Sequence, residues 1–249
     1  MNPDFKKIQE DLKRIGINRG DDILIHASFK SLGKVEGGIQ TLIEALLATL
    51  GDTGTLLMPA LSYQTVTAEN PSFDIRNTPV CVGAVPEFFR TFPGVERSIH
   101  PTHSVCVRGR RQKEYLADSE KDDEPVGEYS PFCKLPAFGG KVLMIGCGTH
   151  PNTSMHGVEE KAGVPYVLSP DKRKYTLVDE TGKQSEKAYF YHYISQNGFA
   201  QRYCRLENLM EFKKGSILQA ECCLIDSAAM WKTGLQKLQE DPFYFVEKL

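Results

Sequence analysis

Three residues near the middle of the 249-residue chain could perform acid–base chemistry together. Thr153, His156 and Glu159 are spaced three positions apart, so on a helix they share one face at intervals of about one turn. A hydroxyl, an imidazole and a carboxylate in line can position a reactant, remove its proton and orient the base. The spacing alone leaves open a capped helix whose histidine and glutamate simply face solvent.

The segments around these residues predict a strand, a turn and a helix in succession. Lys141 to Ile145 is a short apolar run typical of a buried strand, and residues 146–152 contain two glycines. Asn152, Thr153 or Ser154 can each cap the start of a helix. This order directs side chains and helix N–H groups into one crevice.

A second strand, loop and helix near the N-terminus could bind a phosphate. Residues 22–28 predict a buried strand, residues 29–38 a loop with three glycines, and residues 39–50 a helix. Backbone N–H groups at such a helix start can bind a phosphate, and Lys30 and Lys34 add positive charge. The loop matches no nucleotide-binding motif, so its glycines could equally serve only to make tight turns.

The rest of the chain alternates short apolar strands with helices, which predicts an α/β fold. No linker separates the C-terminal part at about 167–249, so we expect a single domain over residues 1–249 with a layer added by this variable part. Residues 60–78 lack periodicity, which is typical of a functional loop. The further elements that we expect are an amphipathic helix closed by Gly16, strands at 54–59, 105–107 and near 217–225, helices at 82–92 and 110–116, a short helical turn from Ser130, a hairpin of 174–178 with 188–193, helical segments near Leu206, and a last helix carrying Trp231, Leu235 and Leu238.

The composition excludes several classes of protein. The net charge is −2 and there is no long basic run, so the sequence carries no electrostatic footprint for nucleic acid. No apolar run approaches the length of a membrane span, and the first 20 residues do not resemble a signal peptide. We therefore expect a cytoplasmic protein without nucleic-acid or membrane partners.

The cysteines and histidines do not form a recognisable metal motif. The seven cysteines are odd in number and lack a C-x-x-C pair, which predicts reduced thiols. The six histidines show no zinc-finger or H-E-x-x-H spacing, so we expect no metal. His100 and His103 precede the strand at 105–107, where each could belong to a site or serve as a hydrogen-bonded structural residue. The acidic run at 118–128 could be a solvated loop or attract a cationic substrate.

Taken together, many short segments resemble the aminoglycoside 3-N-acetyltransferase family, which is structurally distinct from the GNAT acetyltransferases. The resemblance covers residues 5 to 166 in order. It is carried by His26-Ala27-Ser28, Leu32-Gly33, Glu36-Gly37-Gly38, Gly54 to Pro59, Phe73-Asp74, Thr78-Pro79, Pro86 to Arg90, Pro93-Gly94-Val95, Arg97-Ser98, His100-Pro101 with Ser104, Gly127-Glu128, Ser130-Pro131-Phe132, and Asn152-Thr153-Ser154 with His156 and Glu159.

The resemblance implies an α/β sandwich of the antibiotic N-acetyltransferase type, with a mixed sheet and an added C-terminal antiparallel layer. It also implies acetyl-CoA as cosubstrate, direct transfer to an amine of an aminoglycoside or similar amino sugar, and a link to antibiotic resistance. The implied cofactor-binding residues are His26, Ser28, Lys30, Ser31, Gly33, Gly37 and Gly38 around the phosphates, and Arg97, Ser98, His103, Ser104 and Val105 beside pantetheine. The implied substrate-binding residues are Tyr63, Asp74, Glu128 and Glu159.

The same resemblance puts Thr153 and His156 at the reacting centre. An ammonium cannot attack a thioester, so a neutral base such as His156 must first remove a proton. Thr153 or a helix N–H could stabilise the oxyanion, and Glu159 could either orient the ring or hold the substrate. Two alternatives are a hydrolase with Thr153, Ser154 or Cys147 as nucleophile, and a CoA-binding protein without transferase activity. The oligomeric state is open, and a homodimer is one option.

Overall fold

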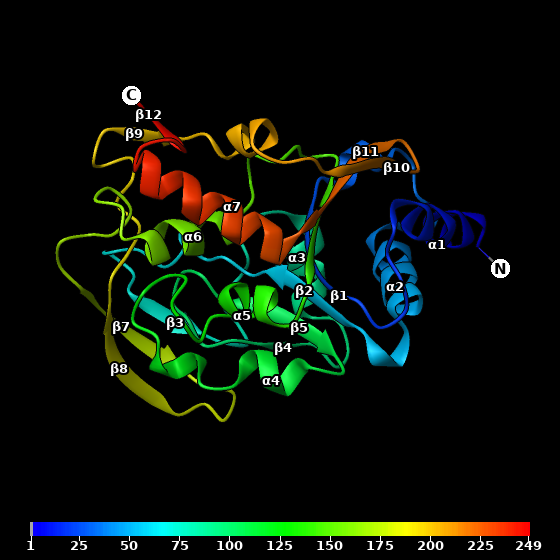
Figure 1. Ribbon diagram of the computed structural model, residues 1–249. Coiled ribbons are helices and arrows are strands. Elements are labelled where there is room, and N and C mark those ends of the chain that lie inside the picture. The colour runs from blue at the N-terminus through cyan, green and yellow to red at the C-terminus, as the bar shows by residue number, and fades with distance from the viewer. Residues whose placement is uncertain (1) are drawn as a thin grey trace.

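The computed structural model describes residues 2–249 and is built around a seven-stranded mixed sheet (Figure 1). The strands lie in the order β10-β11-β6-β1-β2-β5-β4. In that order they span Lys213–Ile217, Ala220–Asp226, Lys141–Ile145, Asp22–Ala27, Thr55–Pro59, Val105–Gly109 and Glu96–Arg97. β6, β1 and β2 are parallel, whereas the strands on either side pair antiparallel. The predicted α/β fold with a mixed sheet is confirmed.

Helices cover both faces of this sheet. One face carries α1 (Pro3–Ile15), α2 (Gly38–Leu50) and α3 (Ala84–Arg90), and the other carries α4 (Gln112–Leu116), α5 (Pro131–Ala137), α6 (Ser154–Ala162) and α7 (Ser227–Glu240). Successive residues of β1 point to opposite faces of the sheet. Ile23 and Ile25 therefore pack in the hydrophobic core beneath α1, α2 and α3, and Leu24 packs in the core beneath the other four helices. A strand buried on both sides reads as a continuous apolar run, which is why the sequence predicted β1.

Two small sheets lie outside the central one. β3 (Ser72–Asp74), β7 (Arg173–Val178) and β8 (Gln184–Tyr189) form one, and β9 (Phe199–Gln201) pairs with β12 (Val246–Lys248) in the other. The predicted hairpin exists, but its second strand begins at residue 184 instead of 188. The side chain of Asp179 accepts hydrogen bonds from the backbone N–H groups of Thr181 and Lys183, so the turn is tight and pairing resumes at once.

The C-terminal part differs from the prediction in one strand. The segment near 217–225 was expected to form a single strand, but it contains the turn between β10 and β11, at which Leu218 has a φ of +51°. No glycine marks this turn. The Leu218 N–H donates to the Asp11 carboxylate, 3.0 Å away on α1, which stabilises the unusual backbone. Both strands join the central sheet.

The helix that carries the candidate catalytic residues is fixed by close contacts. Thr153 is the N-cap of α6. Gly157 faces α7 so closely that an added Cβ would lie 2.7 Å from the Trp231 ring. The Trp231 indole N–H also donates to Ser154 Oγ at 3.1 Å. Gly146, before the helix, has a φ of +62°, and its missing side chain leaves room for Ser31. α6 is therefore held against α7 through Gly157, Ser154 and Trp231.

Two further expectations concern the whole chain. All seven cysteines are free thiols, as predicted from their number and spacing. Within residues 2–249, none of the helices combines the length and the apolar character that a membrane crossing requires.

Candidate active site

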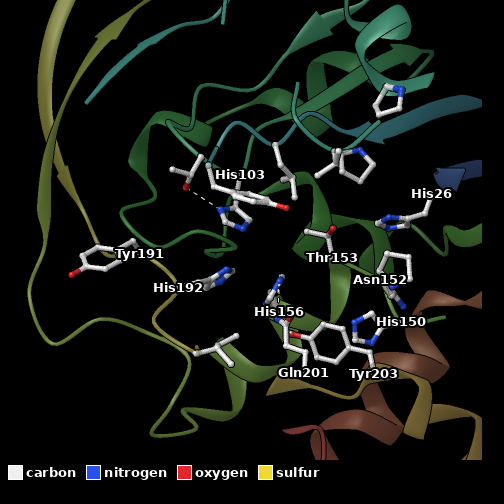
Figure 2. A pocket seen from close by; sticks show the side chains of 18 of the residues that line it. His26, His103, His150, Asn152, Thr153, His156, Tyr191, His192, Gln201 and Tyr203 are labelled. Atoms are coloured by element: carbon white, nitrogen blue, oxygen red, sulfur yellow. Dashed lines mark hydrogen bonds between the residues drawn. The ribbon is translucent and has the colours of Figure 1, made fainter. Parts of the chain in front are cut away.

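A pocket of about 720 Å³ opens at the carboxyl ends of β1 and β2 (Figure 2). Open α/β sheets commonly bind ligands at this edge. Ile25, His26 and Ala27 line one end of the pocket, and Thr153 and His156 line its centre. Two segments from the C-terminal third also line the pocket, through Tyr191, His192, Ile194, Ser195, Gln196, Gln201 and Tyr203. The pocket therefore joins the two strand–loop–helix units that the sequence singled out.

His156 is held by a hydrogen-bonded chain that ends on a buried carboxylate. Its Nδ1 lies 2.8 Å from the hydroxyl of Tyr203, and that hydroxyl donates to Oε2 of Glu159 at 2.5 Å. Because the Tyr203 proton points to the carboxylate, its oxygen accepts from Nδ1–H of His156. This arrangement selects the tautomer in which Nε2 carries the free lone pair. The imidazole can then accept a proton on the side that faces the pocket.

Glu159 is completely buried and does not line the pocket. Its second oxygen accepts from the Tyr166 hydroxyl at 2.8 Å, and its Oε2 lies 3.5 Å from Nδ1 of His156. With both oxygens engaged by tyrosines, the carboxylate can orient the ring and stabilise the imidazolium that forms on protonation. The geometry therefore favours the orienting role over contact with a substrate.

Thr153 lies one turn before His156 and lines the same pocket. Its side chain makes no capping hydrogen bond to the helix that it starts. The hydroxyl is thus available to a ligand, in a position from which it can donate to an oxygen near His156. A donor there is what a developing oxyanion requires.

Two more histidines face His156 from other parts of the chain. The His192 ring stacks on that of His156 with 4.0 Å between centroids, and the His103 ring lies 4.4 Å from that of His192 (Figure 2). Burial lowers the pKa of His103 and His192 well below the usual range, and the neighbouring His156 adds to the effect. Both rings are therefore neutral at pH 7. Glu160 contacts Nε2 of His192 at 2.6 Å.

The predicted phosphate-binding loop begins where the pocket ends. His26 lines the pocket, and burial lowers its pKa to about 3. Ser28 follows β1 directly, and its carbonyl accepts from the Ser31 hydroxyl at 2.6 Å. Lys30 is exposed. Gly33, Gly37 and Gly38 all have positive φ values, at +79°, +77° and +66°, and α2 starts at Gly38.

The residues predicted to run beside pantetheine divide into two groups. His103 lines the pocket, whereas Arg97, Ser98, Ser104 and Val105 are buried and do not. Arg97 donates to Ser104 Oγ at 2.8 Å and to the carbonyls of Thr78 and Ala60, and burial lowers its pKa to about 10. Ser98 accepts from the Val105 N–H. These four residues support the strand entrance on which His103 is placed.

His100 has a structural role in the same segment. It is buried, and its Nδ1 accepts from the N–H groups of Thr102 and His103. Of the two histidines that the sequence left undecided, it is His103 that reaches the pocket.

The predicted substrate-binding residues are also divided. Tyr63 lines the pocket and stacks on His103 with 6.3 Å between ring centroids. Asp74 accepts hydrogen bonds from its own turn, at Arg76 and Asn77, and neither it nor the exposed Glu128 lines the pocket. Among the described residues, no carboxylate lines the pocket, although Glu159 and Glu160 lie directly behind its histidines.

Sequence reasoning did not identify Gln201, Tyr203, Glu160 or His192. Tyr203 is 47 positions from His156, in a short 3-10 helix (η4, Tyr203–Asn208). The Gln201 amide nitrogen lies 2.9 Å from the Tyr203 oxygen and 3.2 Å from His156 Nε2. A run of aromatic and polar residues at 189–203 was the available signal, since such residues in irregular segments often form binding walls.

The sequence and the fold of this chain are similar to those of known acetyltransferases. The family model described as aminoglycoside 3-N-acetyltransferase matches residues 24–239. Aminoglycoside N(3)-acetyltransferase IV from Salmonella sp. is 31% identical over 239 residues, covering 94% of this chain and 87% of that protein. A variant of the aminoglycoside acetyltransferase AAC(3)-IVa in complex with a gentamicin has a TM-score of 0.80 at 29% identity, with 96% and 90% of the two chains covered. AAC-IIIb in a binary complex with CoASH has a TM-score of 0.81 at 26% identity, with 95% and 96% covered.

Proposed function

Because the chain belongs to the aminoglycoside 3-N-acetyltransferase family, we propose that it transfers the acetyl group of acetyl-CoA directly to an amine of an aminoglycoside or similar amino sugar. The family is one of acyltransferases, and structures similar to this one hold CoA or an aminoglycoside. The observation that carries the proposal is the hydrogen bonding and position of the His156 ring. Its Nδ1 is committed to Tyr203 and Glu159, while the ring lines the pocket that ends at β1.

His156 acts as the general base. Its Nε2 takes a proton from the neutral acceptor amine as the lone pair of the amine nitrogen forms a bond to the thioester carbonyl carbon. The positive charge on the ring is stabilised by Glu159 through the Tyr203 hydroxyl. An imidazole that cannot rotate is ready for this step because no reorientation is needed when substrate arrives.

Thr153 supports the second half of the reaction. As the nitrogen attacks, negative charge collects on the carbonyl oxygen, and the Thr153 hydroxyl donates to it. Collapse of this intermediate breaks the carbon–sulfur bond, and the CoA thiolate leaves. The proton held by His156 can pass to that thiolate, which restores the neutral ring.

The CoA phosphates bind at the loop of residues 28–38. The pocket reaches Ile25 to Ala27, so the loop that follows β1 lies next to the cofactor's path. Lys30 provides positive charge, and the α2 helix start provides N–H groups. On the acceptor side, Tyr63 lines the pocket and the Glu159 carboxylate lies behind His156, which favours a cationic amine. Burial raises the pKa of Glu160 well above its ordinary value, so Glu160 adds little negative charge.

A hydrolase is less well supported. Ser154 is fully buried and its hydroxyl accepts from Trp231, and burial raises the pKa of the Cys147 thiol. Both features are unfavourable for a covalent nucleophile. Thr153 is the remaining hydroxyl beside His156, and in the proposed reaction it is the oxyanion donor.

The proposal is tested by measuring thiol release from acetyl-CoA with a panel of aminoglycosides, simple amino sugars and small amines. We expect release only when an acceptor is present, together with a product heavier by one acetyl group. Silence across the panel, with CoA still bound, would favour a CoA-binding protein. A burst of thiol without any acceptor would indicate a hydrolase.

A further inference from the structure

We propose that His103, His156 and His192 form a binding site for a divalent transition-metal ion, of which Zn²⁺ is the best match, and that occupancy of this site blocks acetyl transfer. The three residues come from separate segments: the entrance to β5, helix α6 and the chain after β8. One nitrogen from each lies within 4.8 Å of the other two, and the rings turn toward one space in Figure 2.

The other nitrogen of each ring has a partner of its own. Nδ1 of His103 lies 2.9 Å from the Thr102 hydroxyl, and Nδ1 of His156 lies 2.8 Å from the Tyr203 hydroxyl. Nε2 of His192 contacts the Glu160 carboxyl at 2.6 Å. Partners of this kind fix the tautomer and direction of metal-binding imidazoles. They leave Nε2 of His103 and His156 and Nδ1 of His192 for an ion.

The donor set determines which ion fits. Three imidazole nitrogens suit zinc, copper or nickel, whereas magnesium and calcium require oxygen ligands. Among the described residues, none of those that line the pocket is an aspartate or glutamate. Three histidines around zinc leave a fourth position open to water or to a ligand in the pocket.

Side-chain rotations would complete the coordination, because the stacked rings of His156 and His192 must turn until both in-plane lone pairs point at one ion. Nitrogens bound to zinc at about 2.0–2.1 Å in a tetrahedral arrangement lie about 3.3 Å from one another. The ligand atoms therefore approach one another from separations of up to 4.8 Å. The Gln201 amide nitrogen, 3.2 Å from Nε2 of His156, turns away from that nitrogen when the ion binds.

Metal binding and acetyl transfer compete for one lone pair. An ion on Nε2 of His156 occupies the electrons that the general base needs, so the metal-bound enzyme cannot deprotonate the acceptor. This blocking rests on the proposed function, whereas ion binding itself does not. The two can be measured separately.

The binding experiment uses full-length protein that has been dialysed against a chelator. Zn²⁺ is titrated in competition with a chromophoric chelator, for the wild type, His103→Ala, His192→Ala and the control His150→Ala, which removes a pocket histidine outside the cluster. We expect one equivalent bound by the wild type, affinity lower by about 10-fold or more in the two cluster variants, and affinity within about 2-fold of wild type in the control. Mg²⁺ should not compete. Circular dichroism checks that each variant folds.

Two measurements on the wild type make the result independent of the variants. Crystals soaked in Zn²⁺ should show anomalous density between the three rings. Added Zn²⁺ should abolish thiol release, with half-inhibition near the measured dissociation constant and recovery on adding EDTA.

The outcomes separate the site from the activity. No zinc uptake, equal affinity in the cluster variants, or anomalous density elsewhere would overturn the site. Zinc bound between the rings with no loss of rate would overturn the blocking. A protein that binds zinc at the cluster but acetylates no acceptor would refute the proposed function and leave the site intact.

Discussion

The hydroxyl oxygen of Tyr203 lies 2.8 Å from Nδ1 of His156. Because the same hydroxyl donates to a buried carboxylate, the ring is oriented from behind, and Nε2, which lies 3.2 Å from the Gln201 amide nitrogen, keeps its lone pair. This relationship connects the proposed reacting centre with a C-terminal segment that lies within the residues matched by the family model, although the resemblance seen in the sequence covers only residues 5 to 166. It makes the first prediction possible.

Tyr203→Phe should lower kcat on the order of 10-fold, since a positioned base contributes about 10²–10⁴-fold in total and only its orientation is lost. KM for acetyl-CoA should change little, because the hydroxyl is already engaged by His156 and Glu159. Steady-state kinetics measure both. Tyr166→Phe is the matched control: it removes the other hydroxyl bound to Glu159 but does not touch His156. Equal losses of kcat in the two variants would mean that Tyr203 acts only through general packing.

Thr153→Val should lower kcat about 10²-fold with little effect on binding, because one oxyanion donor contributes on this scale. Valine keeps the shape and removes the hydroxyl. Thr153→Ser, which keeps a hydroxyl at the same place, should retain most of the rate. If valine and serine variants were equally fast, the oxyanion role of Thr153 would have to be abandoned.

Lys30→Ala should raise KM for acetyl-CoA several-fold at low salt and leave kcat nearly unchanged, since an exposed lysine contributes mainly charge. The matched substrate is acetyl-pantetheine, which lacks the nucleotide phosphates. With that donor the variant and the wild type should have the same KM. A loss with both donors would show that Lys30 does not act on phosphate.

Asp122→Asn should stabilise the protein at neutral pH. Burial raises the pKa of Asp122 to about 6 from the ordinary value of 3.8, so the folded state disfavours the charged carboxylate. The penalty is absent below about pH 4, grows up to about pH 6 and is constant above, where it is worth about 3 kcal/mol at most. The asparagine oxygen can still accept from the Tyr129 N–H.

Urea unfolding at pH 4 and pH 7 measures this effect. We expect the free energy of unfolding to rise at pH 7 and to be unchanged at pH 4. Glu10→Gln, at an exposed position of α1, is the control and should behave as wild type. A gain that is the same at both pH values would show that Asp122 is not the titrating group.

Much of the fold could be predicted because the sequence marks it locally. β1, β2 and β6 are continuous apolar runs, and Gly16, Gly51 and Gly163 follow the last residues of helices. The predictions of secondary structure were wrong or incomplete where tertiary contacts determine the backbone conformation. Nothing local announces the turn at Leu218, which Asp11 stabilises from 207 positions away, and the three-residue β3 exists because it pairs with β7.

The site residues that lie on helix α6 could be predicted from the sequence, whereas those that come from distant segments of the chain could not. The spacing of Thr153, His156 and Glu159 placed them on one face, and the structure brings the first two into the pocket. Whether Glu159 faced substrate or the ring depended on Tyr203, a residue with no sequence signal that links it to His156. The histidine cluster is a similar case, because its members are 36 or more positions apart in the chain.

The central claim is that His156 removes the proton from the acceptor amine. The most direct measurement is the single-turnover rate of acetyl transfer by wild type and His156→Gln, with CoA affinity measured in parallel by calorimetry. We predict a rate lower by about 10²–10⁴-fold and a dissociation constant for CoA within about 2-fold of wild type, because the base contributes to chemistry and not to cofactor binding. Equal rates in the two proteins would contradict the account.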